Sequence, residues 1–173
     1  QVVSGEVQER AVRPEVAPLP PIFLEVQPPC SPGGKPYIVR DGPELKKALA
    51  SSFTGTMFIP SGVPIPLSSE LKLIVHSAVT IMGTRNGLDP GALLLTNDPT
   101  DGPVFVVTGH DVRITGLRFQ GPVPTDTEPH RKAKTQVSAI WVDEDVARGN
   151  GVNVVIDNND FWFWTSAIAV GWE

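Results

Sequence analysis

Residues 111–120 read DVRITGLRFQ, and residues 153–162 repeat their pattern as NVVIDNNDFW. Apolar and polar residues alternate in both stretches, so successive side chains point to opposite faces of an extended chain. Three apolar positions match when the stretches are aligned: Val112 with Val154, Ile114 with Ile156, and Phe119 with Phe161. The two stretches therefore predict short β-strands that recur in successive units of one structure.

The repeat extends beyond these strands. SAIWV (138–142) matches SAIAV (166–170), and GPVPTDTEPHRKAKTQ (121–136) lengthens the first unit as an expected loop. An earlier and looser copy consists of three apolar runs: VTIMG (79–83), ALLL (92–95) and VFVV (104–107). Short strands in repeats that tolerate insertions indicate a solenoid, and the repeats lack the long 3.6-residue period that paired helices need.

We therefore expect an all-β fold, a parallel β-helix with about three short strands in each coil and about three to four coils. Interior Val, Ile, Leu and Phe side chains would then stack from coil to coil as continuous ladders. Asn158 and Asn159 align with Gly116 and Leu117 at a corner between strands. Asparagine suits such a corner because it tolerates left-handed backbone and can bond its own chain.

The chain divides into two parts near residue 36. Residues 1–36 hold eight of the eighteen prolines, which block helices and central strands, and predict an extended arm or linker. Residues 37–173 hold the coils of the β-helix, and their last segment, 152–173, reads as an open C-terminal end. Further coils, head-to-tail stacking of another subunit, or the proline-rich arm of a neighbour would each cover that end.

One short helix is expected before the strands, over roughly residues 43–52. Asp41 or Gly42 can cap its N-terminus, Pro43 is tolerated in the first turn, and Glu44 favours the positive end of the helix dipole. The apolar residues recur at helical spacing on one face: Leu45, Ala48 and Leu49.

Composition limits the classes of function. The 173 residues suit one domain, and a formal net charge of −5 without a basic stripe argues against nucleic-acid binding. Cys30 is the single cysteine, so an intrachain disulfide is impossible, and no apolar run reaches the length of a membrane span. Because the chain begins with Gln1 rather than methionine, we expect a processed or excised product. Removal of a secretory signal, with a location outside the cell or in its envelope, would explain this start, and so would trimming of a longer chain.

The run from DGPELKKAL through GTMFIPSGVPIPL, VTIMG, DVRITGLRFQGP and NVVIDNNDF resembles the start of the right-handed parallel β-helix proteins of the pectate-lyase-like superfamily. In that superfamily a short helix caps the N-terminal end, and a strand with a "GT-hydrophobic-P-x-G" pattern opens the first coil. The residues that match this pattern are Gly55, Thr56, Phe58, Ile59, Pro60 and Gly62. The resemblance implies the fold more specifically than the activity, because the superfamily includes lyases, hydrolases, epimerases and non-catalytic proteins.

The same resemblance suggests a calcium site. Pectate lyases use calcium held by carboxylates of neighbouring coils, and VVIDNNDF resembles the strand that carries their "W-I-D-H" tetrad. Asp157 takes the Asp position, whereas Asn158 replaces the His and Val155 replaces the Trp. Hard oxygen ligands could come from four carboxylates: Asp143, Asp145, Asp157 and Asp160. The alternative is that acids in a loop such as VDEDVARGN are solvated turn residues.

Two further groups of residues are candidates for ligand binding. Tryptophans on the outer face of a β-helix would form a platform for sugar rings, unless a downstream segment covers them; the candidates are Trp141, Trp162 and Trp164. A basic cluster in the inserted loop could bind an acidic polysaccharide or act as a base, or be merely solvated; its members are His130, Arg131, Lys132 and Lys134. His76 and His110 lie beside expected turns without a nucleophile to serve.

These observations predict the N-terminal part of a polysaccharide-active β-helix protein, a lyase or a glycoside hydrolase, whose catalytic residues lie outside this stretch. The N-T-D, D-D, H-G and R-I-K motifs of polygalacturonase-type enzymes are absent from the sequence. The alternative is a non-catalytic assembly or carbohydrate-binding module that uses the open end and the tryptophan face. Expected partners are a polysaccharide and further coils or another subunit, with calcium as a candidate cofactor.

Overall fold

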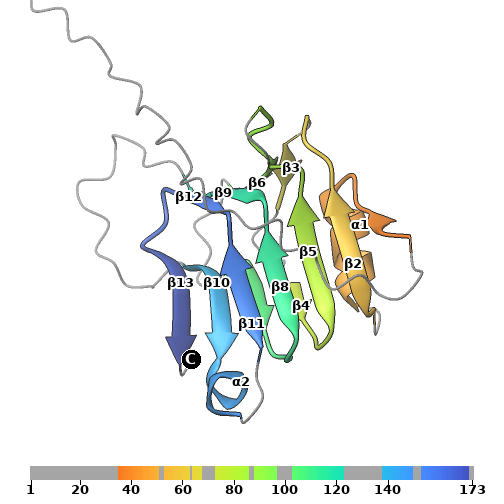
Figure 1. The fold of residues 1–173 in the computed structure, drawn as a ribbon. Coiled ribbons are helices and arrows are strands. Elements are labelled where there is room, and N and C mark those ends of the chain that lie inside the picture. The colour runs from red at the N-terminus through yellow and green to blue at the C-terminus, as the bar shows by residue number, and fades with distance from the viewer. Residues whose placement is uncertain are drawn as a thin grey trace, which may run out of the picture.

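The protein is a stack of short parallel strands, seen in a computed structural model that describes residues 35–50, 53–62, 64–67, 73–85, 88–96, 103–122, 138–149 and 153–171 (Figure 1). Sheet A contains β1 (Tyr37–Ile38), β2 (Gly55–Ile59), β5 (Val79–Gly83), β8 (Val112–Thr115) and β11 (Val154–Asp157). Sheet B contains β3 (Ile65–Pro66), β6 (Ala92–Leu95), β9 (Leu117–Gln120) and β12 (Asp160–Trp162). Sheet C contains β4 (Leu73–Val75), β7 (Phe105–Val107), β10 (Ser138–Asp143) and β13 (Ser166–Gly171).

The chain visits the three sheets in the same order, A then B then C, in each turn of the stack. The turns define coil 1 (β2, β3, β4), coil 2 (β5, β6, β7), coil 3 (β8, β9, β10) and coil 4 (β11, β12, β13). Strands of successive coils pair in parallel, so the predicted parallel solenoid of β-strands is confirmed. The predicted alignment is confirmed too, because Val154 pairs with Val112, Phe161 with Phe119, and Ser166 with Ser138.

Inward-facing side chains form ladders beneath each sheet. In the strand register, one ladder of each sheet consists of Met57, Ile81, Ile114 and Ile156 in sheet A; Ile65, Leu94, Phe119 and Phe161 in sheet B; Leu73, Phe105, Ile140 and Ile168 in sheet C. The rings of Phe119 and Phe161 stack with centroids 4.9 Å apart and planes 7° from parallel. Each aliphatic member that is fully buried contributes about 1.5–3 kcal/mol by leaving water, which makes these ladders the main source of stability.

The corner between sheets A and B turns within a single residue of left-handed backbone. Gly116 occupies it in coil 3 with φ of +71°, and Asn158 occupies it in coil 4 with φ of +54°. Asn159 then replaces missing strand bonds, because its Oδ1 accepts from the Leu117 N–H (3.0 Å) and its Nδ2 donates to the Ile114 carbonyl (2.8 Å). The expected left-handed backbone is thus confirmed at Asn158, whereas the amide that forms hydrogen bonds is that of Asn159, and it bonds the preceding coil.

Helix α1 (Gly42–Ala50) agrees with the expected helix, although residues 51–52 lie outside the described ones. The Asp41 carboxylate accepts a hydrogen bond from the Glu44 N–H (2.7 Å), and Glu44 in turn accepts one from the Arg40 N–H (2.8 Å). The first bond satisfies an N–H group that the first turn of a helix leaves free, and the second holds the residue before the cap. The predicted apolar face is buried and packs against β4: Leu45, Ala48 and Leu49.

A second helix, α2 (Glu144–Arg148), was not expected, because its sequence is short and polar enough to resemble a turn. Asp143 begins it as the N-cap residue, and its carboxylate accepts a hydrogen bond from the Asp145 N–H (2.9 Å). Val146 anchors the helix to the core with 8% of its surface exposed. A single buried residue gives too weak a helical period to be recognised in the sequence.

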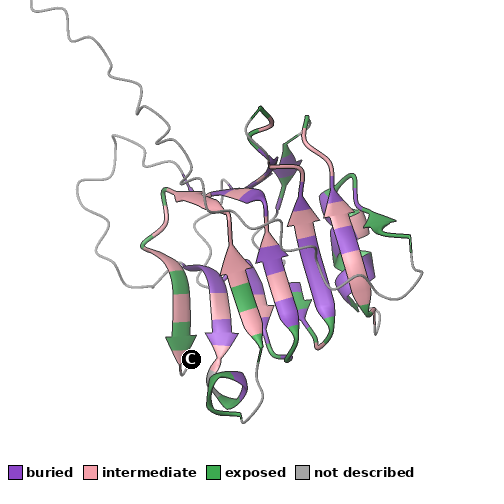
Figure 2. Ribbon diagram, in the orientation of Figure 1, coloured by how far each residue is buried: buried purple, intermediate pink, exposed green. Residues whose placement is uncertain are grey.

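The core is more open in coil 4 than in the coils before it. Ile140 and Val142 of β10 are buried, whereas their partners in β13, Ile168 and Val170, are 38% and 62% exposed. Figure 2 shows the same change from buried to intermediate and exposed residues on reaching β11 and β13. Among the described residues, no helix is long and apolar enough to cross a membrane.

Candidate functional site

The outward-facing residues of sheet B bring polar, apolar and aromatic side chains onto one surface. Strand register places them in two ladders: Leu93, Arg118 and Asp160 in one, and Pro66, Leu95, Gln120 and Trp162 in the other. Neighbouring strands lie about 4.8 Å apart, and alternate residues of a strand about 6.6 Å apart. We name these residues the sheet B face.

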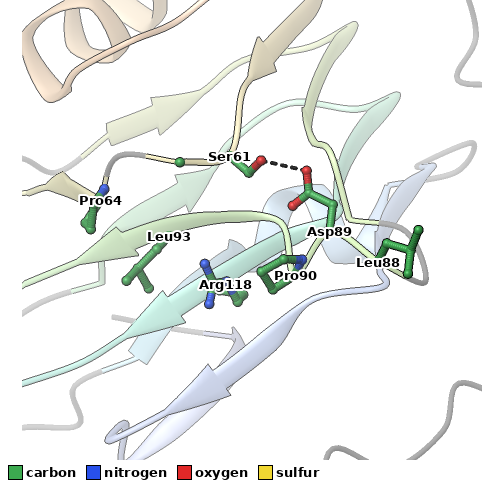
Figure 3. A pocket seen from close by; sticks show the side chains of 8 residues that line it. Ser61, Pro64, Leu88, Asp89, Pro90, Leu93 and Arg118 are labelled. Atoms are coloured by element: carbon green, nitrogen blue, oxygen red, sulfur yellow. Dashed lines mark hydrogen bonds between the residues drawn. The ribbon is translucent and has the colours of Figure 1, made fainter.

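A pocket of about 620 Å³ opens at the edge of this face, where sheet B meets the loops that leave sheet A (Figure 3). Its lining combines a carboxylate, a guanidinium and apolar side chains: Ser61, Gly62, Pro64, Leu88, Asp89, Pro90, Leu93 and Arg118. Leu88 is 99% exposed at its rim. The volume falls within the range of small-molecule binding sites. We name it the Asp89 pocket.

Asp89 is held in place by residues from two coils. Its Oδ2 accepts a hydrogen bond from the Ser61 hydroxyl (2.6 Å), and its Oδ1 accepts one from the Gly91 N–H (2.8 Å). These bonds, the one from Ser61 most strongly, hold the pKa of Asp89 below its usual value, and the charge of Arg118 acts in the same direction. The side chain is therefore a fixed carboxylate anion at neutral pH, suited to accepting hydrogen bonds and unsuited to general acid catalysis.

Two glycines, Gly83 and Gly91, lie against the same point of coil 3. A Cβ on Gly83 or on Gly91 would collide with the Gly116 carbonyl of coil 3, and Gly91 also has a left-handed φ of +89°. Residues 84–90 are thus inserted between two positions that both lie against Gly116. Asp89 of this stretch forms its hydrogen bond with Ser61, and Leu88, Asp89 and Pro90 line the pocket.

Two arginines near the pocket, Arg118 and Arg85, each have a defined partner. Arg118 donates from Nε to the Gly91 carbonyl (3.0 Å), which fixes its side chain on the pocket wall. Arg85 of coil 2 forms an ion pair with Asp160 of coil 4 at 2.6 Å, and its side chain is only 9% exposed. Of these two arginines, Arg118 therefore lines the pocket, while Arg85 is occupied by Asp160.

The four carboxylates predicted as calcium ligands lie in different contacts. Asp157 receives two hydrogen bonds from Arg113, from Nε (3.1 Å) and from Nη2 (2.7 Å). Asp160 pairs with Arg85, as above, while Asp143 and Asp145 belong to the start of α2. The part of the chain that the structure describes contains no group of three or more His, Cys, Asp or Glu residues that could hold a metal ion. Arginine guanidinium groups therefore pair with Asp157 and Asp160.

The three candidate tryptophans occupy three different environments. Trp162 is half-buried on the sheet B face opposite Gln120, and Trp141 takes an outward position in sheet C between Val106 and Ala169. Trp164 instead packs against the core, and its Nε1 donates to the Phe119 carbonyl (3.1 Å). The alternation of inward and outward side chains along β12 ends at Phe163, whose φ of +64° turns the chain toward sheet C.

The remaining candidates contribute no described ligand site. His130, Arg131, Lys132 and Lys134 lie outside the described residues. His110 Nδ1 lies 2.9 Å from Asp111 Oδ2, and both side chains are exposed. The Ser77 hydroxyl accepts a hydrogen bond from the backbone N–H of His110 (3.1 Å), which braces the corner between coils 2 and 3.

Comparisons with protein-family models, with curated proteins and with solved structures find no match for this chain. Its site is therefore described by its own geometry. The structure places two predicted residues, Asp160 and Trp162, on the sheet B face, and two other residues of that face, Leu93 and Arg118, line a pocket that the sequence analysis missed. The sequence NGLDPG (86–91), rich in turn-forming residues, was the available signal for that pocket, although nothing local connected it to Ser61.

Proposed function

We propose that this chain is the N-terminal part of a polysaccharide-active β-helix protein of the pectate-lyase-like type, and that its sheet B face binds the polysaccharide. A right-handed winding, a capping role for α1, and a location outside the cell or in its envelope belong to the same proposal. The observation that carries it is the Asp89 pocket, whose lining residues Leu93 and Arg118 belong to the same sheet B face as the outward-facing Trp162.

The side chains on this surface suit the chemistry of a sugar. A pyranose ring has apolar C–H faces, which aromatic and aliphatic side chains can cover, and hydroxyl groups that donate and accept hydrogen bonds. Trp162 and Leu93 supply apolar surface, while Asp89 supplies an acceptor and Arg118 donors. Because the strands repeat at about 4.8 Å, a linear chain that runs across the coils meets side chains at regular intervals.

Binding is better supported than bond cleavage within the described residues. Glycoside hydrolysis needs two carboxyl groups on either side of the scissile bond, one of them protonated as the acid. Asp89 has a lowered pKa, and Asp157 and Asp160 are each paired with an arginine. We therefore assign substrate binding to this surface and place the catalytic residues of a lyase or hydrolase outside the described residues.

A second candidate function, assembly, is favoured by the exposed apolar residues of coil 4. Coil 4 stacks on coil 3 in register, and a second copy of the chain that continues this stacking would cover Ile168 and Val170, which are 38% and 62% exposed. Light scattering over a range of concentrations tests this candidate. A mass that rises with concentration supports assembly, whereas a monomer at every concentration excludes it and leaves carbohydrate binding alone.

The primary proposal is tested by affinity electrophoresis of the protein in gels that contain soluble polysaccharides, both neutral and acidic. We expect retardation by at least one polysaccharide. Trp162→Ala should weaken that interaction about tenfold, equivalent to about 1.4 kcal/mol, since it removes the aromatic platform. Trp141→Ala makes the same change on sheet C and serves as the matched control. Equal loss in both variants, or no retardation of the wild type by any polysaccharide, would contradict the proposal.

A further inference from the structure

Gln120 lies between an aliphatic and an aromatic residue on the sheet B face. In the strand register it pairs with Leu95 of coil 2 on one side and with Trp162 of coil 4 on the other. All three side chains face outward and are half-buried, so part of each stays in contact with water. Within the part of the chain that the structure describes, the side-chain amide of Gln120 forms no hydrogen bond. This amide is therefore open to a molecule that lies on the sheet B face.

Backbone and core contacts fix Gln120 and Trp162 side by side. The N–H of Gly121, the residue after Gln120, donates a hydrogen bond to the Trp162 carbonyl (2.9 Å). A Cβ on Gly121 would collide with the backbone of coil 4, so the glycine permits the two coils to approach this closely. Beneath the sheet, the rings of Phe119 and Phe161, one residue earlier in each strand, stack with centroids 4.9 Å apart. The two outward side chains are thus positioned on neighbouring strands before a ligand binds.

An aromatic ring with an amide beside it matches the face and the edge of one sugar residue. When the apolar face of a pyranose ring lies on Trp162, its hydroxyl groups project from the ring edge, where Gln120 is the neighbouring side chain of the ladder. A side-chain amide presents N–H donors and a carbonyl acceptor at adjacent positions, and a hydroxyl group both donates and accepts. Two hydroxyl groups on adjacent ring carbons can therefore bond to Gln120 together, one as donor and one as acceptor.

Gln120 differs from the other residues that surround it on this face. It alone in its outward ladder can both donate and accept through its side chain, since the other members are Pro66, Leu95 and Trp162. In the neighbouring ladder, Arg118 donates to the Gly91 carbonyl (3.0 Å). Asp160 of that ladder pairs with Arg85. Recognition of paired hydroxyl groups beside Trp162 therefore depends on Gln120.

We infer that Gln120 is a specificity-determining residue of the sheet B face, and that it recognises two adjacent hydroxyl groups of the sugar residue that stacks on Trp162. The inference rests on the proposed function, because it requires that a polysaccharide binds this face. It adds the chemical class of the bound residue, a pyranose whose hydroxyl groups on two neighbouring carbons are both unsubstituted. A site that hydrogen-bonds a hydroxyl group discriminates against sugars that lack it.

The test is affinity electrophoresis in gels that contain one of four soluble polysaccharides. Xylan, xyloglucan and polygalacturonate have 1,4-linked residues with hydroxyl groups on the adjacent carbons C2 and C3, whereas a linear β-1,3-linked glucan has none on adjacent ring carbons within its chain. We expect the wild type to bind at least one of the 1,4-linked polysaccharides about tenfold more tightly than the 1,3-linked glucan. Gln120→Leu keeps the size of the side chain and removes both hydrogen bonds. It should weaken binding of that 1,4-linked polysaccharide about tenfold and remove most of the preference.

A double-mutant cycle shows whether Gln120 and Trp162 contact the same sugar residue. In the background of Trp162→Ala, which removes the stacking surface, Gln120→Leu should weaken binding by less than about twofold, because the hydroxyl groups are no longer held beside the amide. Thr115→Val is the matched control, since it removes a hydrogen-bonding group from an outward position of the same coil on sheet A. It should leave binding unchanged, and thermal unfolding verifies that every variant is folded.

The outcomes separate the inference from the proposed function. Binding by Gln120→Leu within about twofold of the wild type, fully additive losses in the cycle, or tighter binding of the 1,3-linked glucan would overturn the inference, while binding to the sheet B face stands. Gln120 would then only cover the sheet. If neither these polysaccharides nor any other retards the wild type, the proposed function falls and the inference falls with it.

Discussion

Arg85 of coil 2 reaches across coil 3 to form an ion pair with Asp160 of coil 4 at 2.6 Å. The Arg85 side chain is 9% exposed and that of Asp160 is 43% exposed, so the arginine lies beneath the surface and its carboxylate partner lies at the surface. The pair connects coils that share no strand pairing. It also fixes Asp160 on the sheet B face, next to Arg118 in the strand register.

Removing this connection should destabilise the end of the stack. We expect Arg85→Ala to lower the free energy of unfolding by about 1–2 kcal/mol, because it removes a partly buried ion pair and the packing of the arginine stem. Urea denaturation measures the change, and a double-mutant cycle with Asp160→Asn isolates the pair. If the two substitutions have fully additive effects, the ion pair contributes nothing and this interpretation is wrong.

Asn159 should be a larger contributor, because its side chain satisfies two backbone groups of coil 3. Asn159→Ala leaves the Leu117 N–H and the Ile114 carbonyl without these bonds, and each unsatisfied group costs about 1–3 kcal/mol where it is shielded from water. We expect a loss of about 2–4 kcal/mol in urea denaturation. Hydrogen exchange gives the sharper readout: the Leu117 amide should lose protection, and unchanged protection there would contradict the assigned bond.

Calcium should have little effect on stability. The oxygens of Asp157 are bonded to Arg113, and Asp160 is paired with Arg85, so binding a cation would require both arginines to be displaced. We expect the melting temperature in millimolar calcium to stay within about 1 °C of that in a chelator. A melting temperature that rises clearly with calcium in the wild type, and does not rise in Asp157→Asn, would contradict this expectation and support a calcium site at Asp157.

Asp89 should make stability depend on pH in the acidic range. Its pKa is lower in the folded protein than in the unfolded chain, so its contribution is fully present above the unfolded value and disappears as the pH falls through the folded value. The difference in unfolding free energy between the wild type and Asp89→Asn should therefore be constant near neutral pH and shrink as the solution is acidified below the ordinary aspartate pKa. A difference that grows on acidification would mean that the hydrogen bonds of Asp89 favour its protonated form.

The repeated strands could be predicted from the sequence because the pattern that identifies each strand is local. A period of two residues identifies each strand, and matched apolar positions such as Ile114 and Ile156 give the register between coils. Asn158 was recognisable for a similar reason, since few residues other than glycine adopt the left-handed backbone found there. Recognising these features requires only the neighbouring residues and the next repeat in the sequence.

The pocket and the charge pairs could not be predicted from the sequence, because they depend on contacts between residues that are distant in the chain. Ser61 and Asp89 come from different coils, and no pattern around either residue indicates the other. Asp157, predicted as a metal ligand, pairs with Arg113, which lies in another coil. This pairing could not be predicted for the same reason. Trp164 departed from the expected alternation because Phe163 turns the chain before it, which a strand pattern cannot reveal.

The central claim, that the sheet B face binds a polysaccharide, is tested most directly by nuclear magnetic resonance. Backbone amide shifts are recorded while an oligosaccharide of the best-binding polysaccharide is titrated into the labelled protein. We expect saturable shifts at the amides of Gly91, Leu93, Arg118 and Trp162, and none at Val106 or Trp141 on sheet C. Shifts confined to sheet C, or no shifts for an oligosaccharide whose parent polysaccharide binds, would contradict it.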